Sequence, residues 1–210
     1  MSALDYEYSG LMAQAWDPLR GDTSHWSDRA FFLEAIVRYG QPVLDVGCGT
    51  GRLLVEFAAQ GIDIDGVDNS PEMLALCREK AARAGVTIDV FEQDMEELDL
   101  PRRYSTILIP SSSLQLVIDP EAASRAMQRM RLHLVEGGAL VAPIMTLWWQ
   151  GQPLETGWER TAPFPAGGTV VRRAWSRYDP ATECEDTRDT YQILMDDDRI
   201  SSEEDNSENH

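Results

Sequence analysis

The 210-residue sequence predicts an α/β fold, with a doubly wound and mostly parallel sheet covered by helices on both faces. Apolar stretches of strand length alternate with stretches of helical length between residues 42 and 144. Three glycines at every second position follow the first of these strands, and the pair Ser70-Pro71 is typical of a helix start. The length is enough for one sizeable core and short for two ordinary domains.

The expected elements follow in chain order. Residues 1–40 are rich in aromatic side chains, and apolar positions recur at helical spacing over residues 30–38, so one or two helices should precede the first strand. Strands are expected at residues 42–46, 62–67, 86–91, 105–109 and 139–144, and helices at about 51–60, from residue 70 onward and at about 120–134.

The pattern changes after Met145. Residues 150–168 contain four glycines and three prolines, which predicts a loop. Residues 169–178 and 188–195 are β-branched and aromatic, and a turn at Asp179-Pro180 would join them as an antiparallel pair. Residues 196–210, with seven carboxylates and one arginine, are expected to be disordered.

Charge and composition narrow the class of protein. The net charge of −18 would repel the phosphate backbone of a nucleic acid, so nucleic-acid substrates are not expected. No apolar run is long enough to span a membrane and no leader precedes the fold, which favours a cytoplasmic protein. Cys48, Cys77 and Cys184 lack metal-type spacing, so we expect reduced thiols and no metal site.

The main motif is VLDVGCGTGRL at residues 43–53, a strand that runs into a glycine loop and then a helix. Glycine lets the backbone approach a ligand closely and turn sharply into the helix. Asp68 ends the next strand, seventeen residues beyond Gly51, where a carboxylate can accept hydrogen bonds from both hydroxyls of a ribose. Asp94 follows the third strand, where it can accept from an adenine amine while the Met95 N–H donates to a ring nitrogen.

Two alternatives stay open at this point. The glycines and Asp68 would also suit a nicotinamide-binding fold, although dinucleotide sites favour G-x-G-x-x-G and this loop has the spacing G-x-G-x-G. Asp45 is either a ligand-binding carboxylate or a structural one that the backbone amides of the loop satisfy.

The segments VLDVGCGTG, GVDNSPEML and QDMEEL resemble the motifs of class I methyltransferases that bind S-adenosylmethionine (SAM), in order and at the family's intervals, over about half of the chain. This resemblance implies a Rossmann-like fold with SAM as its cofactor. Asp45, Gly47, Gly49 and Gly51 would surround the methionine end of SAM. Asp68 would hold the ribose, and Asp94 with Met95 the adenine.

The resemblance also implies an acceptor side. Methyl transfer would take place at residues 109–115, with Pro110 and Ser111 on the cofactor side and Ser112 and Ser113 toward the acceptor. The WSDR, GTGRLL and SSSLQ segments resemble small-molecule methyltransferases that act on amines or hydroxyls. Trp148 and Trp149 would lie where family substrates enter, unless they only pack.

The implied chemistry needs little from the protein. SAM carries an activated methyl group, so the chain has to align an acceptor lone pair in line with the methyl–sulfur bond and exclude water, and no metal is required. The catalytic base is not assigned, and the candidates are His25, Tyr6 and Tyr8.

The family's fold suggests a division into a helical lid (residues 1–40), a SAM-binding core (41–146), a loop with antiparallel strands (147–195) and an acidic tail (196–210). Family members usually add a helix and two more strands to the sheet. We interpret residues 169–178 and 188–195 as an antiparallel insert, so that the terminal strands of the sheet are missing. A non-catalytic SAM-binding or regulatory protein is therefore the alternative function, ahead of an NAD-dependent oxidoreductase.

Overall fold

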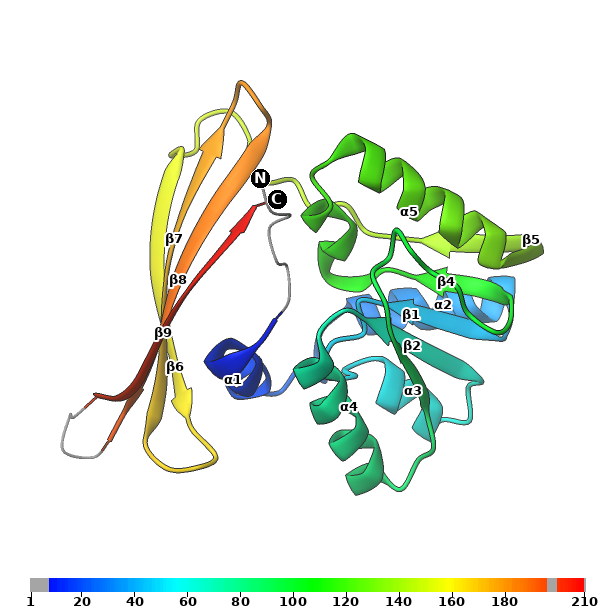
Figure 1. The fold of residues 1–210 in the computed structure, drawn as a ribbon, viewed down its shortest axis with the longest axis horizontal. Helices are drawn as coiled ribbons and strands as arrows, with labels where there is room; N and C mark the ends of the chain where they lie inside the picture. Colours follow the sequence, from blue (N-terminus) through cyan, green and yellow to red (C-terminus); the bar gives the residue numbers. More distant parts are fainter. Residues whose placement is uncertain (1–7, 196–199, 210) are drawn as a thin grey trace. The chain divides into compact units, whose positions relative to one another are not determined.

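The computed structural model describes residues 8–195 and 200–209. The chain divides into two units: residues 25–144, called the α/β unit here, and residues 1–24 with 145–210, called the antiparallel unit. Figure 1 shows the elements of each unit.

The α/β unit is built on a parallel five-stranded sheet with the strand order β3-β2-β1-β4-β5. Because β1 pairs with β2 on one side and β4 on the other, the order of the strands reverses at β1. The carboxyl ends of strands at such a reversal are where open α/β sheets bind ligands. The elements are α2 (Asp28–Tyr39), β1 (Val43–Val46), α3 (Leu54–Ala59), β2 (Ile64–Asp68), α4 (Pro71–Ala84), β3 (Asp89–Glu92), β4 (Tyr104–Leu108), the 3₁₀ helix η1 (Pro110–Leu116), α5 (Pro120–His133) and β5 (Leu134–Val141).

Helices cover both faces of this sheet, as the sequence predicts (Figure 1). Helices α2, α3 and α4 pack on one face around a cluster that includes Phe32, Phe57 and Leu74. Helix α5 packs on the other face, where Met130 joins Ile107. All four residues of β1 are buried, which agrees with a strand enclosed between two helical layers.

The start of α4 has the helix cap that Ser70-Pro71 predicts. The Ser70 side chain accepts a hydrogen bond from the Met73 N–H at 3.1 Å, and Pro71 occupies the first turn. Gly85 closes the helix in the left-handed conformation, with φ of 69°. The cap by Ser70 fixes the short segment between Asp68 and the start of α4.

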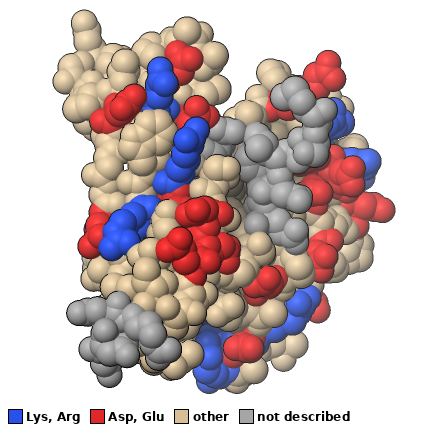
Figure 2. All heavy atoms as spheres, turned by 60° about the vertical axis from the view of Figure 1, so that its left-hand side comes forward, with Lys and Arg blue, Asp and Glu red and all other residues tan. Residues whose placement is uncertain are grey.

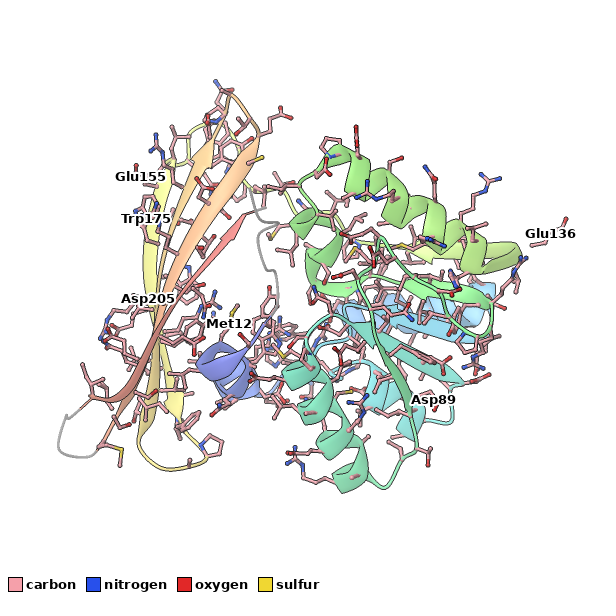
Figure 3. The ribbon with its side chains drawn as sticks, in the orientation of Figure 1. Met12, Asp89, Glu136, Glu155, Trp175 and Asp205 are labelled. Carbon is pink, nitrogen blue, oxygen red and sulfur yellow. The ribbon has the colours of Figure 1, made fainter. Side chains whose placement is uncertain are left out.

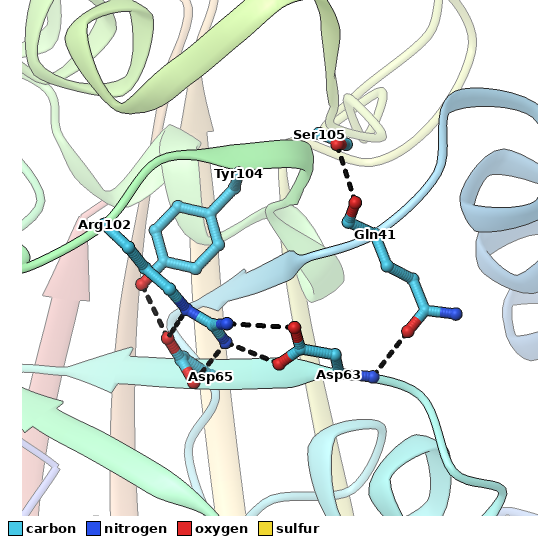
Figure 4. Close-up of polar contacts among 6 residues, drawn as sticks. All are labelled: Gln41, Asp63, Asp65, Arg102, Tyr104 and Ser105. Atoms are coloured by element: carbon cyan, nitrogen blue, oxygen red, sulfur yellow. Dashed lines mark hydrogen bonds and ion pairs between the residues drawn. The ribbon is translucent and has the colours of Figure 1, made fainter.

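A charged network ties together the amino-terminal ends of the strands (Figure 4). The Arg102 guanidinium donates to both oxygens of Asp63 and to both oxygens of Asp65, at 2.7–2.9 Å. The Tyr104 hydroxyl also donates to Asp65, at 2.8 Å. Burial and this hydrogen bond raise the pKa of Tyr104, so its hydroxyl keeps the proton that it donates. The network lies at the end of β2 opposite the glycine loop and links β2 to β4 across β1, which lies between them.

The antiparallel unit contains α1 (Gly10–Arg20) and a four-stranded sheet in the order β6-β7-β8-β9. Leu11, Met12 and Ala15 of α1 pack against Val170 and Tyr191 of the sheet. Met12 points from the helix to the sheet, whereas Glu155 and Trp175 lie on the other side of it (Figure 3). The strands are β6 (Glu155–Pro163), β7 (Thr169–Asp179), β8 (Cys184–Leu194) and β9 (Ile200–Asn209).

Two expectations need correction here. Residues 155–163 form β6 rather than a loop, because they pair with β7 over their whole length. Residues 200–209 form β9 rather than a disordered tail, because backbone pairing with β8 requires no apolar side chains; residues 196–199 and 210 lie outside the described residues. Residues 25–40 group with the α/β unit, and the expectation that residues 1–40 form a lid stays a prediction.

The two stretches interpreted as an antiparallel insert lie in β7 and β8, in a sheet separate from the parallel one. Across residues 8–195 and 200–209, every helix falls short of the length and apolar character that a membrane span requires.

Candidate functional site at the carboxyl ends of the parallel strands

The glycine loop follows β1 directly. Gly47, Gly49 and Gly51 have φ values of 69°, 53° and 76°, in the left-handed region that favours glycine. The N–H groups of Gly47 and Cys48 donate to the Val67 carbonyl at 2.8 and 3.0 Å, which anchors the loop to the end of β2.

The three glycines serve different purposes. A Cβ at Gly51 would lie 2.5 Å from the Cys77 sulfur of α4, and a Cβ at Gly47 would lie 2.8 Å from the Ser113 hydroxyl. A Cβ at Gly49 would meet nothing within 4 Å. Gly47 and Gly51 therefore allow close packing, while Gly49 presents backbone to an open side where a ligand has room.

Asp45 is buried beneath this loop, with 1% of its surface exposed. Its Oδ1 has no hydrogen-bond partner in the part of the chain that the structure describes. The pKa of Asp45 is raised to about 7, chiefly by burial and in part by the nearby charge of Asp68, against the lowering effects of the Arg52 charge and of a hydrogen bond from the Leu54 N–H. A buried carboxylate oxygen without a donor is rare in folded proteins, and it fits an ammonium group of a ligand.

Asp68 at the end of β2 is held by backbone donors on both oxygens. Oδ2 accepts from the Gly49 N–H at 2.8 Å, and Oδ1 accepts from the Ser70 N–H at 3.0 Å. Burial raises the pKa of Asp68, while these two hydrogen bonds and one from Asn69 lower it. An ionised carboxylate can accept about four hydrogen bonds, so each oxygen keeps capacity for a ribose hydroxyl.

Asp94 follows β3 and is exposed, with Met95 beside it half-buried against the core. The Asn69 side-chain amide donates to the Asp94 carboxylate at 3.1 Å, which links the ends of β2 and β3. The sequence reasoning did not single out Asn69; the only signal for it was its place directly after Asp68.

The segment that follows β4, residues 109–115, contacts the glycine loop. Pro110 is buried, and Ser111 and Ser112 have φ values of 56° and 62°. Such left-handed backbone costs a non-glycine residue roughly 1–3 kcal/mol and is often found at functional sites. The Ser113 hydroxyl donates to the Pro110 carbonyl at 2.9 Å and lies against Gly47, so this expected acceptor-side residue does lie beside the loop.

Two ion pairs fix α2 to the start of α3. The Arg52 guanidinium donates to both oxygens of Asp28, at 3.1 and 2.5 Å, and lies 4.9 Å from the ring centre of Trp26. Arg29 pairs with Glu56 at 2.5 Å. The WSDR and GTGR segments thus contact each other, which the motifs alone did not reveal. His25 is exposed in the turn before α2.

The remaining predicted residues lie in the antiparallel unit or outside the described chain. Tyr8 packs edge-on against Trp16, with ring centres 4.9 Å apart, and Trp148 stacks on Tyr178 at 5.5 Å. Trp149 is 59% exposed. Tyr6 lies outside the described residues. Their roles in substrate binding or catalysis stay predictions.

This arrangement defines a class of protein: a Rossmann-like domain with a glycine loop at the switch point and carboxylates at the ends of three neighbouring strands. A family model described as a methyltransferase domain matches residues 43–138. The match covers slightly less than half of the chain, and it shows that residues 43–138 resemble the methyltransferase domain of that family.

Named relatives with similar sequences are also methyltransferases. A putative methyltransferase of Geobacillus is 32% identical over 130 residues, covering 60% of this chain and 53% of the relative. A dTDP-3-amino-3,6-dideoxy-α-D-glucopyranose N,N-dimethyltransferase of Streptomyces fradiae is 30% identical over 172 residues, covering 80% of this chain. The chain spans 65% of the length of that enzyme.

Solved structures share the fold. A SAM-dependent methyltransferase from Clostridium acetobutylicum superposes with a TM-score of 0.72 at 19% identity, covering 91% of this chain and 76% of the other. A sugar N-methyltransferase from Streptoalloteichus superposes with a TM-score of 0.71 at 25% identity, covering 90% of this chain and 75% of the other.

Proposed function

We propose that this protein transfers a methyl group from SAM to a nitrogen or oxygen of a small molecule, and that its acceptor is an amino sugar attached to a nucleoside diphosphate. The relatives named for dTDP-linked amino sugars support the acceptor class. The observation that carries the proposal is the unpartnered Oδ1 of Asp45 beneath a glycine loop whose Gly49 N–H orients Asp68. A cytoplasmic location and the absence of nucleic-acid substrates belong to the same proposal, supported by the net charge of −18.

Different residues of the site bind different parts of the cofactor. Asp45 accepts the ammonium of the methionine part of SAM, and Gly49 leaves the room that this part needs. Asp68 accepts hydrogen bonds from the ribose hydroxyls with the lone pairs that Gly49 and Ser70 leave available. Asp94, oriented by Asn69, accepts from the adenine amine.

SAM, when bound, supplies a methyl group on a positively charged sulfur, ready for in-line displacement. The chain's part is to position the acceptor and exclude water. Ser112 and Ser113 lie on the acceptor side, where Ser113 is held by Pro110 against the glycine loop. An amine acceptor has to arrive neutral and loses a proton after transfer; His25, Tyr6 and Tyr8 are the candidates for that base.

Calorimetric titration with SAM, and separately with NAD, tests the cofactor. We expect saturable SAM binding that S-adenosylhomocysteine displaces. Replacing Asp68 with alanine should weaken SAM binding by roughly 1–3 kcal/mol, because buried ribose hydroxyls would lose their acceptors. Asp89→Ala, at the amino-terminal end of β3 (Figure 3), is the matched control and should bind SAM normally. Binding of NAD alone would refute the proposal.

A non-catalytic SAM-binding protein is the competing function. Slow production of S-adenosylhomocysteine without an acceptor, accelerated by amino-sugar nucleotides, would support catalysis. Tight SAM binding without turnover across a panel of amines and hydroxylated metabolites would favour the competitor.

A further inference from the structure

Charged side chains of both signs are interspersed on the described part of the face in Figure 2. Among exposed pairs, Arg173 contacts Glu159 at 2.7 Å. Arg177 lies 3.8 Å from Glu155. Exposed pairs of this kind contribute little to stability and indicate no ligand. The buried side chain of His133 indicates more, because polar atoms that a protein buries have defined partners.

His133 is the last residue of α5, and 7% of its surface is exposed. The Leu100 N–H donates a hydrogen bond to its Nε2 at 2.9 Å. Its Nδ1 lies 2.8 Å from the Arg129 carbonyl oxygen, one turn earlier in the helix. Because Nε2 accepts, Nδ1 carries the ring proton and donates to that carbonyl. Both ring nitrogens are therefore bonded, and the imidazole is held in one orientation.

The donor to His133 belongs to the connection between β3 and β4, residues 93–103, called the strap here. At the start of the strap, the Gln93 N–H donates to the Asp68 carbonyl at 3.1 Å. Near its end, Arg102 donates to Asp65 (Figure 4). Asp68 and Asp65 lie toward opposite ends of β2, so the strap runs along the parallel strands from the cofactor end to the far end.

Helix α5 supports the middle of the strap. Leu98 and Leu100 are buried, and they belong to the same cluster as Ala126 and Met130 of α5. Ala126, Met130 and His133 follow one another at spacings of four and three residues, which places them on one face of the helix. His133 thus adds one directed hydrogen bond to an otherwise apolar contact.

The cofactor end of the strap is closed by a side chain. The Gln93 Oε1 accepts from the Asp99 N–H at 2.8 Å, and its Nε2 donates to the Asp99 carbonyl at 3.2 Å. Within this loop, the Glu97 N–H donates to the Asp94 carbonyl at 3.0 Å. Asp94 therefore lies in a loop whose closing residue, Asp99, directly precedes the residue that His133 holds.

We propose that His133 and Gln93 are positioning residues for the adenine of SAM: they hold the strap so that Asp94 and Met95 meet the base. Both act through the strap backbone and not on the reacting atoms. The inference rests on the proposed function in taking Asp94 and Met95 as the adenine contacts, whereas the hold of His133 on the strap can be measured without any cofactor.

Hydrogen exchange of the cofactor-free chain tests this hold. His133→Leu replaces the acceptor with an apolar side chain, and the amides of Leu100, Asp99 and Glu97 should exchange roughly tenfold faster, as expected when one hydrogen bond is lost. The Glu97 hydrogen bond is not itself removed by the substitution. Faster exchange at Leu100 alone would overturn the proposal, because His133 would then have no effect on the loop that contains Asp94.

Two further variants separate positioning from stability. His133→Gln keeps an acceptor, its Oε1, for the Leu100 N–H and should restore the protection of all three amides. Phe32→Leu lowers the Tm from the opposite face of the sheet and should leave these amides as in the wild type. If Phe32→Leu speeds their exchange as much as His133→Leu does, the strap responds to stability alone and the proposal is wrong.

Calorimetry with S-adenosylhomocysteine and S-inosylhomocysteine tests the link to the base. The second compound has a carbonyl in place of the adenine amine, and the wild type should bind it roughly tenfold more weakly, since Asp94 loses a donor. His133→Leu and Gln93→Ala should each lose most of this preference, while His133→Gln and Phe32→Leu should keep it.

The outcomes distinguish this inference from the proposed function. Weaker binding of both compounds to His133→Leu, with the preference unchanged, would show a structural role only and overturn the inference while the cofactor assignment stands. If the wild type binds neither compound, the proposed function fails and the adenine part of the inference fails with it.

Discussion

The two sheets of this protein place functional groups in different ways. In the parallel sheet, β1 is wholly buried, and the residues that we propose bind SAM lie at or near the carboxyl ends of the strands. In the antiparallel sheet, β7 alternates between buried and more exposed residues over most of its length, and its charged side chains stand on the faces. Parallel strands covered on both faces leave only their ends for chemistry, whereas a sheet with one open face offers that face.

This difference affects how well each sheet tolerates substitutions. A loop at the end of a buried strand is confined by packing on several sides, as Gly51 is between α3 and α4. An exposed strand such as β6 depends mainly on pairing with β7 and on the partners of individual side chains. We therefore expect larger losses in the α/β unit.

Gly51→Ala should give the largest effect. Its Cβ would lie 2.5 Å from the Cys77 sulfur at a φ of 76°, and the combined overpacking and backbone strain should lower the free energy of unfolding by about 4 kcal/mol. Urea unfolding measures the loss. Gly49→Ala, with a φ of 53° and nothing within 4 Å, should lose only about 1 kcal/mol. Similar losses for the two variants would show that packing does not confine the loop.

Asp65→Ala should lower the free energy of unfolding by about 3 kcal/mol, because the buried Tyr104 hydroxyl loses its acceptor and Arg102 keeps only Asp63. Asp189→Ala, which removes the partner of Arg172, is the counterpart in the other sheet. Hydrogen exchange should show lost protection mainly in the unit that carries each change. Loss of protection throughout the chain from Asp189→Ala would contradict this expectation.

SAM affinity should depend on pH through Asp45. The pKa of about 7 in the folded protein exceeds the usual value of roughly 4, so the folded state binds this proton more tightly than the unfolded chain does. The free energy of unfolding should then fall as the pH rises from about 4 to about 7, and level off above. Because the ammonium of SAM needs the ionised carboxylate, affinity should drop about tenfold for each pH unit below 7.

Calorimetry between pH 6 and pH 8 checks this dependence. Asp45→Asn should bind SAM weakly at every pH and lose the dependence. A pH profile that Asp45→Asn leaves unchanged would assign the titration to another group.

Glu204→Ala should have the smallest effect, about 1 kcal/mol, because it removes one hydrogen bond at a helix end. Ser9 makes no side-chain cap at the start of α1, and Glu204 of β9 instead accepts from the Leu11 N–H at 2.7 Å. Thermal unfolding measures the loss of stability, and hydrogen exchange of the Leu11 amide reports the loss of this hydrogen bond. Unchanged protection of that amide would show that β9 does not support α1 in solution.

The α/β unit was largely predictable from local sequence. Strand β1, the glycine loop and the cap of α4 depend on residues close together in the chain, and periodicity and glycine spacing record them directly. The positions of Asp45, Asp68 and Asp94 could be predicted for the same reason, since each lies in or just after an apolar strand; their role in binding SAM stays a prediction.

The antiparallel unit was harder to predict. Strand β6 contains glycine and proline near its ends and β9 is almost without apolar residues, so neither carries the usual strand signal. Both exist because a neighbouring strand supplies hydrogen-bond partners, which is information held elsewhere in the chain.

The sequence by itself determined the class of fold, the cofactor loop and the order of the carboxylates, because these follow from short-range patterns. Only the tertiary structure decided that Asp28 holds Arg52, that Asn69 links Asp68 to Asp94, and that Arg160 stands opposite Arg172. Such contacts depend on strand register and helix packing between distant segments, and a one-residue shift in register would turn Arg160 to the other face.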